Sequence, residues 1–397
     1  AVFGPTAAFN FDTSRFLDKW LRDMRSEQFP GGGIPNTVPR QGYGFPTTMP
    51  DMAVDWWDDA CVLVPWAEYE ARGDEEVLRR NYAMMKKYIK AQLFWAGLFS
   101  FGKNRYIWSN IAMLHFGDWV APDVPQMGQW QARHKWTGTA SIKSCASKVA
   151  RIAEILGEKA DAEYYRDIAD KVSDAYVSVL TDGNGKLLEE FQTAYVLPLW
   201  LDMFPDAETK KKAVKNLARL VEKSDYCIGT GFPGTPYILF ALADNGEEET
   251  AFKMLMNTKC PSWLYEVRLG ATTIWERWDG LDENGLCPIG DDGTGGMISY
   301  NHYASGAVGA FLYERIAGLE PTEAGYKKFR VKPLVGGGLT GARASLRTPY
   351  GLIKTEWKTE NGKFTLSVTV PVNTTCEVTL PGGKTESVGS GSYVFTA

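Results

Sequence analysis

The sequence predicts a two-part α + β protein: a domain of antiparallel helical hairpins, for which the nearest closed architecture is a toroid of six hairpins, followed by a small antiparallel β-sandwich. Two patterns support this. Over residues 1–321 apolar side chains recur at helical spacing, and over residues 322–397 they alternate with polar ones. The first part also shows no strand pattern between its helices, which favours antiparallel helical pairs.

The helices are predicted from apolar side chains that share one helical face and from residues that typically cap helix ends. Phe16, Trp20 and Met24 fall on one helical face, and Asp74 is an N-cap that begins a helix reaching about Leu93. About ten or eleven helices are expected. A closed ring of six hairpins needs twelve, so the first helix is expected to be missing. Further helices are predicted at residues 54–72, 137–157, 161–180, 190–203, 207–223, 235–245, 247–258 and 302–317.

The second part of the chain is predicted as strands. Residues 355–358, 364–370 and 376–380 alternate with a period of two, and Pro381, Gly382 and Gly383 form a turn after the last of them. Short strands separated by glycine and proline turns are typical of a β-sandwich. The domain boundary is therefore placed after residue 321.

Composition excludes several functions. The net charge of -5 argues against nucleic acid as a partner. The chain has 3 His, none at ligand spacing, so no metal and no cofactor is predicted. No apolar run is long enough to span a membrane, and no signal peptide is visible. The compartment is left open between the cytoplasm and the periplasm or secretion.

The chain is rich in tryptophan, with 14 residues in 397. Large side chains in the core explain part of this number. The alternative is a carbohydrate cleft, because indole faces pack on the apolar C–H faces of sugar rings. Composition alone does not decide between the two.

The strongest candidate for a catalytic group is Glu276, which lies between Trp275 and Arg277 and is followed by Trp278. Burial against indoles raises the pKa of a carboxyl group and a neighbouring guanidinium lowers it. This balance suits a general base. Trp275 and Arg277 are predicted to contact the substrate beside it. The structural alternative is a buried Glu–Arg pair that braces two helices.

Three further clusters are candidates. In the run from Asp55 to Asp59, three carboxylates and two indoles precede an apolar helix, although acidic residues there also act as N-caps. Gly117 is followed by Asp118 and Trp119, a loop that presents both side chains. Residues 300–303, with His302 among them, follow the glycine-rich loop 290–296, and this context favours a site.

Together these clusters resemble the α-L-rhamnosidases of glycoside hydrolase family 78. The segments that carry the resemblance are, in the family's order, residues 62–66, 117–119, 230–237, 261–265, 270–279 and 301–304. The resemblance covers nearly the whole chain. It implies an (α/α)6 toroid with a C-terminal β-sandwich, and hydrolysis of terminal α-L-rhamnosyl groups with inversion. The implied substrate is a rhamnose-containing glycoside or polysaccharide.

The resemblance also implies roles for single residues. Glu276 matches the general base and His302 matches a histidine that contacts the sugar. The remaining matches are aromatic walls and acidic positions of the sugar subsite: Trp57, Trp119, Asp59 and Asp118.

In the family, the general acid lies in a stretch that directly precedes a segment similar to residues 2–12. The acid, an adjacent arginine and at least two sugar-binding carboxylates are therefore expected upstream of Ala1. The family's N-terminal β-domains are expected there too, as partners of this chain. The chain is interpreted as a C-terminal fragment with little or no hydrolysis of its own, since losing the acid costs about 10²–10⁴-fold in rate.

Two other functions fit the same residues. Another toroid hydrolase, or a polysaccharide lyase with His302 or Tyr303 as its base, would use the same cleft, and a lyase product would absorb ultraviolet light. A non-catalytic carbohydrate-binding protein would keep the cleft and bind sugar without turnover.

Overall fold

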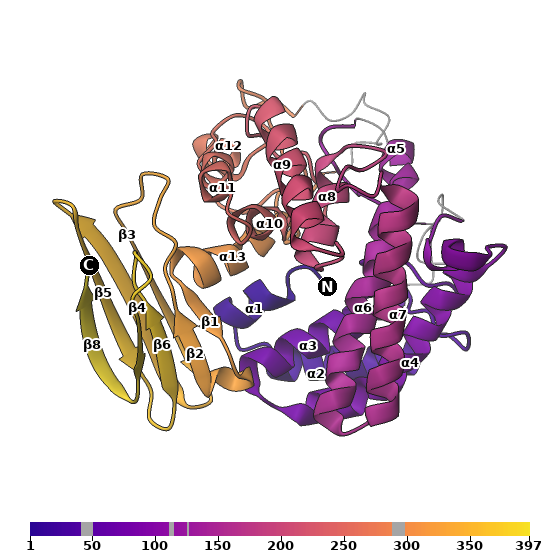
Figure 1. Cartoon of the computed structure of the whole chain (residues 1–397), viewed down its shortest axis with the longest axis horizontal. Helices are drawn as coiled ribbons and strands as arrows, with labels where there is room; N and C mark the ends of the chain where they lie inside the picture. The colour runs from indigo at the N-terminus through magenta and orange to yellow at the C-terminus, as the bar shows by residue number, and fades with distance from the viewer. Residues whose placement is uncertain (41–50, 111–114, 125–126, 288–297) are drawn as a thin grey trace.

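The computed structural model describes residues 1–40, 51–110, 115–124, 127–287 and 298–397. It consists of a helical domain and a β-domain that lie side by side (Figure 1). The helical segments are α1 (Gly4–Asn10), α2 (Ser14–Glu27), α3 (Ala60–Arg72), α4 (Glu75–Gly97), η1 (Gly102–Tyr106), α5 (Met127–Ala132), α6 (His134–Leu156), α7 (Lys159–Leu180), α8 (Gln192–Trp200), α9 (Ala207–Lys223), α10 (Ile238–Ala243), α11 (Glu248–Leu255), α12 (Trp263–Arg268), η3 (Ser305–Ala307), α13 (Val308–Phe311) and the π-helical turn η4 (Leu312–Ile316).

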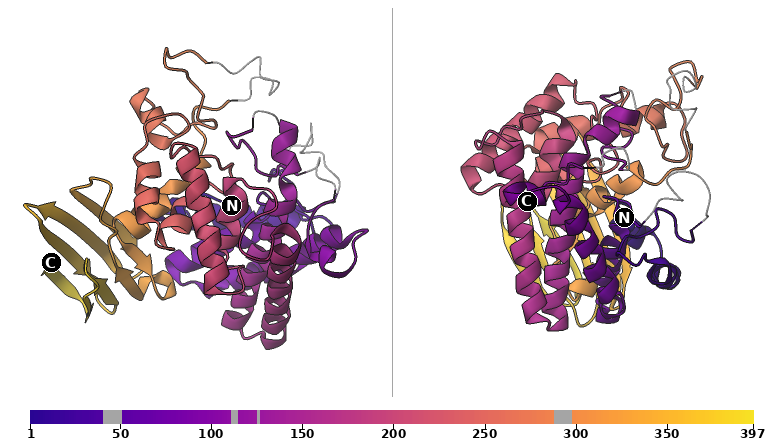
Figure 2. Two further views of the ribbon diagram at one scale, coloured as in Figure 1. Left: turned by 45° about the horizontal axis from the view of Figure 1, so that its top comes forward. Right: turned by 90° about the vertical axis from the view of Figure 1, so that its right-hand side faces the viewer.

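Neighbouring helices pair as hairpins around a central region, where the N-terminus lies (Figure 1). The longest pair, α6 and α7, is joined at Gly157, whose φ of 82° ends α6 with a left-handed cap. The pair α3 and α4 is joined in the same way at Gly73, and the Asp74 carboxylate caps α4 by accepting from the Glu76 amide. Figure 2 shows the long α6–α7 pair from two further sides.

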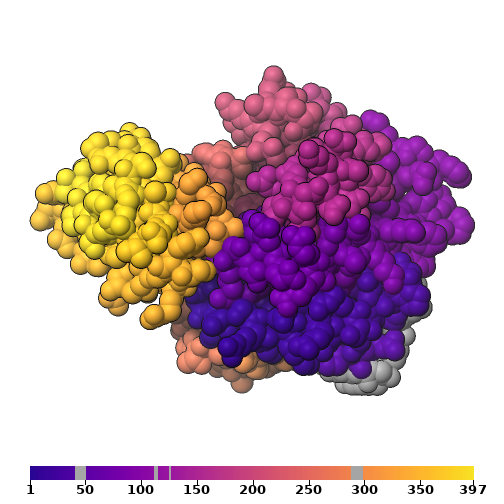
Figure 3. All heavy atoms as spheres, turned by 90° about the horizontal axis from the view of Figure 1, so that it is seen from below, coloured from indigo at the N-terminus to yellow at the C-terminus, as the bar shows by residue number. Residues whose placement is uncertain are grey.

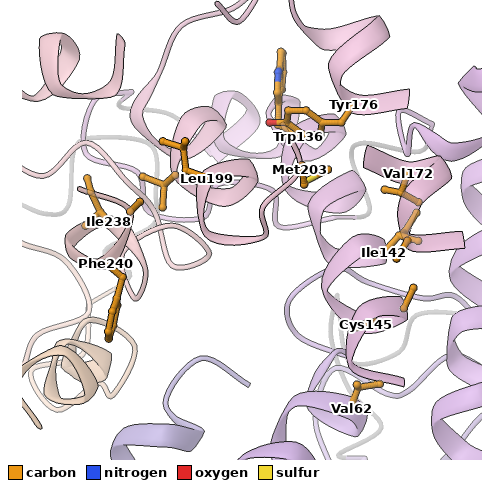
Figure 4. Close-up of a cluster of buried hydrophobic side chains, with 14 of the residues drawn as sticks. Val62, Trp136, Ile142, Cys145, Val172, Tyr176, Leu199, Met203, Ile238 and Phe240 are labelled. Carbon is orange, nitrogen blue, oxygen red and sulfur yellow. The ribbon is translucent and has the colours of Figure 1, made fainter. Parts of the chain in front are cut away.

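The core of the helical domain lies between the inner faces of these hairpins. The first half of α6 is buried on all sides, since residues 136–142 are all buried, and its second half buries one face, with Cys145, Val149 and Ile152. Figure 4 shows part of this cluster, with side chains from four helices that are all at most 3% exposed: Ile142, Cys145, Val172, Tyr176, Leu199, Ile238 and Phe240.

Several predicted helix limits were wrong. The helix predicted over 54–72 begins at Ala60, because residues 55–59 form a turn in which Trp56 has a φ of 64°. The segment predicted as helical over 302–317 becomes α-helical only at Val308. The short helices α1, α5 and α12 were not predicted. Each has at most seven residues, too few for a clear helical period.

The β-domain contains β1 (Leu319–Pro321), η5 (Ala324–Tyr326), β2 (Lys328–Val331), β3 (Gly341–Thr348), β4 (Gly351–Glu360), β5 (Lys363–Val370), β6 (Thr375–Thr379), β7 (Thr385–Val388) and β8 (Gly391–Thr396). They form two four-stranded sheets, in the orders β1-β2-β6-β7 and β3-β4-β5-β8. The predicted period of two is confirmed in β4 and β5, whose buried side chains alternate.

One pairing differs from the antiparallel prediction: β2 and β6 are parallel. The chain leaves β2, forms β3, β4 and β5 in the second sheet, and returns as β6 beside β2. A long crossover of this kind allows a parallel pair, whereas a hairpin does not.

The two domains meet through buried polar contacts. The Trp357 indole of β4 is fully buried and donates to the Ile316 carbonyl at 2.8 Å. β1 pairs with β2 although it precedes residue 322, where the sequence places the boundary. The division after residue 321 therefore stays a prediction. Figure 3 shows the β-domain as a lobe beside the helical domain. Over the described residues, no helix is both long and apolar enough to cross a membrane.

Candidate active site

A cavity of about 280 Å³ lies in the helical domain, and the first two residues of the chain are part of its wall. Among the described residues that line it, Glu276 is the one with a carboxyl group. Part of the wall consists of aromatic and imidazole rings that come from distant segments: Trp20, Trp56, Trp57, Phe116, Trp119, Phe232, His302 and Tyr303. Such a lining suits a ligand with apolar faces and hydroxyl groups.

The rings form a continuous series. Trp57 stacks on Phe116 with 4.1 Å between ring centroids, and Phe232 lies 6.3 Å from Trp57. His302 stacks between Phe232 and Tyr303, at 5.0 Å from each. The parts of these rings that line the cavity can pack on an apolar sugar face.

The loop 115–121 carries two of these rings, and its backbone is tightly held. Gly117 has a φ of 62°, and a Cβ there would lie 2.1 Å from the Trp130 carbonyl oxygen. The next residue, Asp118, is fully buried. Its carboxylate accepts from the Thr193 hydroxyl at 2.8 Å, the Gly231 amide at 2.9 Å and the Arg133 guanidinium at 3.1 Å. Asp118 therefore braces the loop.

The Gly231 backbone lies directly against that loop. A Cβ at Gly231 would lie 2.4 Å from the Trp119 carbonyl oxygen, so only glycine allows this approach. The next amide, of Phe232, donates to the same Trp119 carbonyl at 2.9 Å. Together these contacts place the Phe232 ring beside Trp57.

The segment around Glu276 is held from two sides. The Glu276 amide donates to the Ser299 carbonyl at 2.8 Å, and the Trp275 amide donates to the Glu266 carboxylate at 3.1 Å. Arg277 makes a two-pronged contact with Asp279, at 3.1 and 3.0 Å. The Glu276 side chain is thereby directed to the cavity, and its neighbour Trp275 packs edge-on against Tyr300.

His302 is positioned by the same segment, since its amide donates to the Ile274 carbonyl at 2.8 Å. Its Nδ1 accepts from the Ala304 amide at 3.3 Å, and burial lowers the pKa of the ring. A neutral imidazole whose Nδ1 accepts carries its proton on Nε2. His302 can therefore donate to a ligand oxygen.

Burial also shifts the pKa values of the carboxyl groups in and around the site. It raises the pKa of Glu276, against the opposing effects of a backbone hydrogen bond from Ser299 and the Arg277 charge. Burial likewise raises the pKa of Asp59 to about 6 and that of Asp118 to about 6. Over the described part of the chain, no three His, Cys, Asp or Glu side chains are grouped as metal ligands.

A comparison with protein families decides the affiliation. A sequence model described as the bacterial α-L-rhamnosidase 6 hairpin glycosidase domain matches residues 1–316. The chain belongs to this family. A second model, the bacterial α-L-rhamnosidase C-terminal domain, matches residues 318–395. The family resemblance is confirmed.

Individual α-L-rhamnosidases are similar over the whole chain. One from Formosa agariphila is 35% identical over 399 residues, and the chain spans 40% of its length. The crystal structure of the Aspergillus terreus α-L-rhamnosidase has a TM-score of 0.89 at 33% identity, with 100% of this chain and 44% of that chain covered.

The Streptomyces avermitilis α-L-rhamnosidase, solved in complex with L-rhamnose, has a TM-score of 0.86 at 33% identity, with 100% of this chain and 37% of that chain covered. The toroid with a C-terminal β-domain, predicted from the sequence, is confirmed by these solved rhamnosidases. The chain thus spans less than half the length of each of these relatives.

In this chain, the predicted site residues fall into two groups. Those that line the cavity are Trp57, Trp119, Glu276 and His302. Those that lie outside the lining are Asp59, Asp118, Trp275 and Arg277. Asp59 is fully buried and accepts from Tyr88, Gln92 and Ser141, at 2.7, 3.2 and 2.9 Å. Substrate contact by the second group stays a prediction.

The wall also contains residues that were not proposed as site residues from the sequence, among them Phe116, next to Gly117, and Phe232, in the segment 230–237. Both lie within motifs that the resemblance uses, but a phenylalanine alone gives no signal that separates a wall from a core. The glycine-rich loop 290–296 expected before His302 lies outside the described residues.

Proposed function

We propose that the protein containing this chain hydrolyses terminal α-L-rhamnosyl groups with inversion, and that Glu276 is its general base. The observation that carries the proposal is the cavity: Glu276 and His302 line it together with the rings of Trp57 and Trp119. The names of the similar proteins support rhamnose as the sugar.

The residues suggest how the sugar is held. The rings of Trp57 and Trp119 pack on its apolar faces, and His302 donates from Nε2 to a hydroxyl. The cavity of about 280 Å³ is of the order of a single sugar ring with bound water. The substrate class is a glycoside or polysaccharide that ends in rhamnose.

In the chemical step, Glu276 accepts a proton from a water molecule. The water oxygen bonds to the anomeric carbon, while the bond from that carbon to the leaving oxygen breaks. The leaving oxygen takes a proton from a carboxylic acid on the opposite face, about 6.5–9.5 Å from the base in inverting enzymes.

A substitution of Glu276 tests the proposal. Glu276→Gln keeps the shape of the side chain but cannot accept the proton, so kcat on an aryl α-L-rhamnoside should fall about 10²–10⁴-fold in the complete protein. The affinity for L-rhamnose, measured by calorimetry, should change little, because Gln keeps the packing.

The matched control is Glu283→Gln, an exposed glutamate of the same segment that pairs with Arg268. It should leave kcat unchanged. If Glu276→Gln retains wild-type kcat, Glu276 is not the base. If the wild-type protein neither binds L-rhamnose nor cleaves the glycoside, the proposed substrate is wrong.

A further inference from the structure

A second cluster of titratable side chains lies behind the wall of the cavity and does not line it. Asp55 is fully buried, His115 is 1% exposed, and His134 and Thr137 of α6 are fully buried. The rings of His115 and His134 stack with 4.2 Å between centroids, and the Trp108 indole lies edge-on to His115 at 4.6 Å.

Asp55 is the centre of this cluster. Its Oδ1 lies 2.7 Å from His115 Nδ1, and its Oδ2 accepts from the Thr137 hydroxyl at 2.6 Å. Burial raises the pKa of Asp55, but the hydrogen bonds and charges around it, from His115 above all, lower that pKa to below its ordinary value. The carboxylate is therefore ionised, and His115 donates from Nδ1.

This hydrogen bond joins the turn at residues 55–59 to the loop 115–121, and both segments carry rings of the cavity wall. Asp55 and Trp57 belong to one turn, and His115 and Phe116 are neighbours in one loop. The stack of Trp57 on Phe116, at 4.1 Å, joins the same two segments a second time. If the hydrogen bond between Asp55 and His115 is lost, the stack of Trp57 on Phe116 is the remaining one of these two contacts between the turn and the loop.

The turn needs such a restraint. Trp56 has a φ of 64°, a conformation that is strained for a bulky residue and persists only where the surroundings enforce it. Its indole donates to the Thr137 carbonyl at 2.9 Å. Thr137 therefore holds the turn through both Asp55 and Trp56, and α6 serves as the fixed support.

We propose that Asp55 and His115 are positioning residues of the sugar subsite, whose hydrogen bond holds the Trp57 indole against the Phe116 ring. The inference rests on the proposed function for the identity of the bound sugar, whereas the contacts between Asp55, His115, Trp57 and Phe116 do not depend on it. A buried polar pair of this kind contributes little net stability compared with apolar residues of the same size. The role of the pair is instead to fix the relative positions of the two segments that carry Trp57 and Phe116.

The test compares two substitutions of His115 in the 397-residue chain. His115→Phe keeps a ring of similar size but removes the donor to Asp55. His115→Asn places an amide N–H close to the position of Nδ1 and restores it. We expect affinity for L-rhamnose to fall about tenfold in the Phe variant, the effect of one lost hydrogen bond to a charged group. The Asn variant should recover most of it.

Hydrogen exchange supplies a measurement without ligand. In His115→Phe, amides of residues 54–59 and 115–121 should both exchange faster, while those of α7 keep their protection. The matched control is Tyr82→Phe, which removes the 2.7 Å hydrogen bond from Tyr82 to Asp161 between α4 and α7. It should change neither the exchange of these segments nor the affinity for rhamnose.

Unchanged exchange at residues 54–59 in His115→Phe would overturn the proposal, as would wild-type rhamnose affinity. If that variant does not fold, Thr137→Val decides, because it removes the donor to Asp55 Oδ2 without changing the side-chain shape. It must then speed exchange in both segments, or the proposal fails. If the wild-type chain does not bind L-rhamnose, the exchange result alone decides the coupling, and the proposed function is tested separately by the Glu276→Gln experiment on the complete protein.

Discussion

At the scale of single residues, the candidate chemistry depends on how Glu276 holds its charge. The sequence indicates two opposing effects, burial beside indoles and the charge of Arg277. The structure gives their outcome: burial is the larger effect, and the pKa of Glu276 is raised. Arg277 donates two hydrogen bonds to Asp279. The negative charge of that carboxylate reduces the electrostatic effect of Arg277 on Glu276. No spacing rule could have indicated that contact.

Arg277→Gln should raise the pKa of Glu276 further, because it removes a positive charge that favours the ionised carboxylate. A general base works only when ionised, so the acid limb of the pH profile of kcat/KM should move to higher pH in the complete protein. Arg268→Gln, in an exposed pair with Glu283, should leave the limb where it is. An unmoved limb in Arg277→Gln would refute the electrostatic role.

At the scale of elements, the site is built by loops that the helices hold at fixed positions. The sequence predicts the helical pairs well, because a long helix repeats its apolar face many times. It predicts the helix limits less well. The turn at residues 55–59 resembles the start of α3 in sequence, yet the contacts of Asp55 with His115 and Thr137 keep it outside the helix. Both partners lie far along the chain.

The close approach of Gly231 to the loop 115–121 gives a prediction at this scale. Gly231→Ala would place a Cβ 2.4 Å from the Trp119 carbonyl oxygen, so the two loops must separate. The free energy of unfolding should fall by about 1–3 kcal/mol, as for other overpacked sites. The affinity for L-rhamnose should fall as well, because Phe232 moves away from Trp57. Denaturant unfolding and calorimetry measure the two effects.

Gly389→Ala is the control for Gly231→Ala, since a Cβ at Gly389 meets nothing within 4 Å. Its unfolding free energy should stay within about 0.5 kcal/mol of wild type. Equal stability of the two variants would show that the contact between the loops is not tight.

At the scale of the whole molecule, the junction of the two domains contains a larger cavity, of about 450 Å³, between α1, α3 and the β-domain. Glu70 and Glu314 both line it. Burial raises the pKa of Glu70 to about 7 and that of Glu314 to about 8, although Arg315 opposes the second shift. We therefore expect the stability of the junction to depend on pH.

The sign of this effect follows from the proton count. Between about pH 4.5 and pH 8 the folded state keeps a proton on Glu314 that the unfolded state has lost. The contribution of Glu314 to stability is therefore full below pH 4.5 and is lost as the pH rises through about 8. Glu314→Gln cannot ionise, so the Tm of the 397-residue chain should fall less between pH 5 and pH 8 than in wild type.

The control is the exposed residue Glu163 of α7, whose change to Gln should leave the slope of Tm against pH as in wild type. A Glu314→Gln variant with the wild-type slope would show that Glu314 is ionised in the folded protein throughout this range.

By itself, the sequence determined the two-part architecture, the family and the segments that form the site. These properties depend on local repeats and on motifs of a few residues, which can be recognised in the sequence alone. Trp57, Trp119, Glu276 and His302 were found in this way, and all four line one cavity.

Only the tertiary structure decided which side chains face that cavity. Asp59 and Asp118 stand beside Trp57 and Trp119 in the sequence, but hydrogen bonds from distant segments turn both carboxylates into the interior. Phe232 and the Asp55–His115 pair depend on contacts between loops far apart in the chain. Such contacts form between surfaces that exist only after the hairpins have packed, which is why no local pattern contains them.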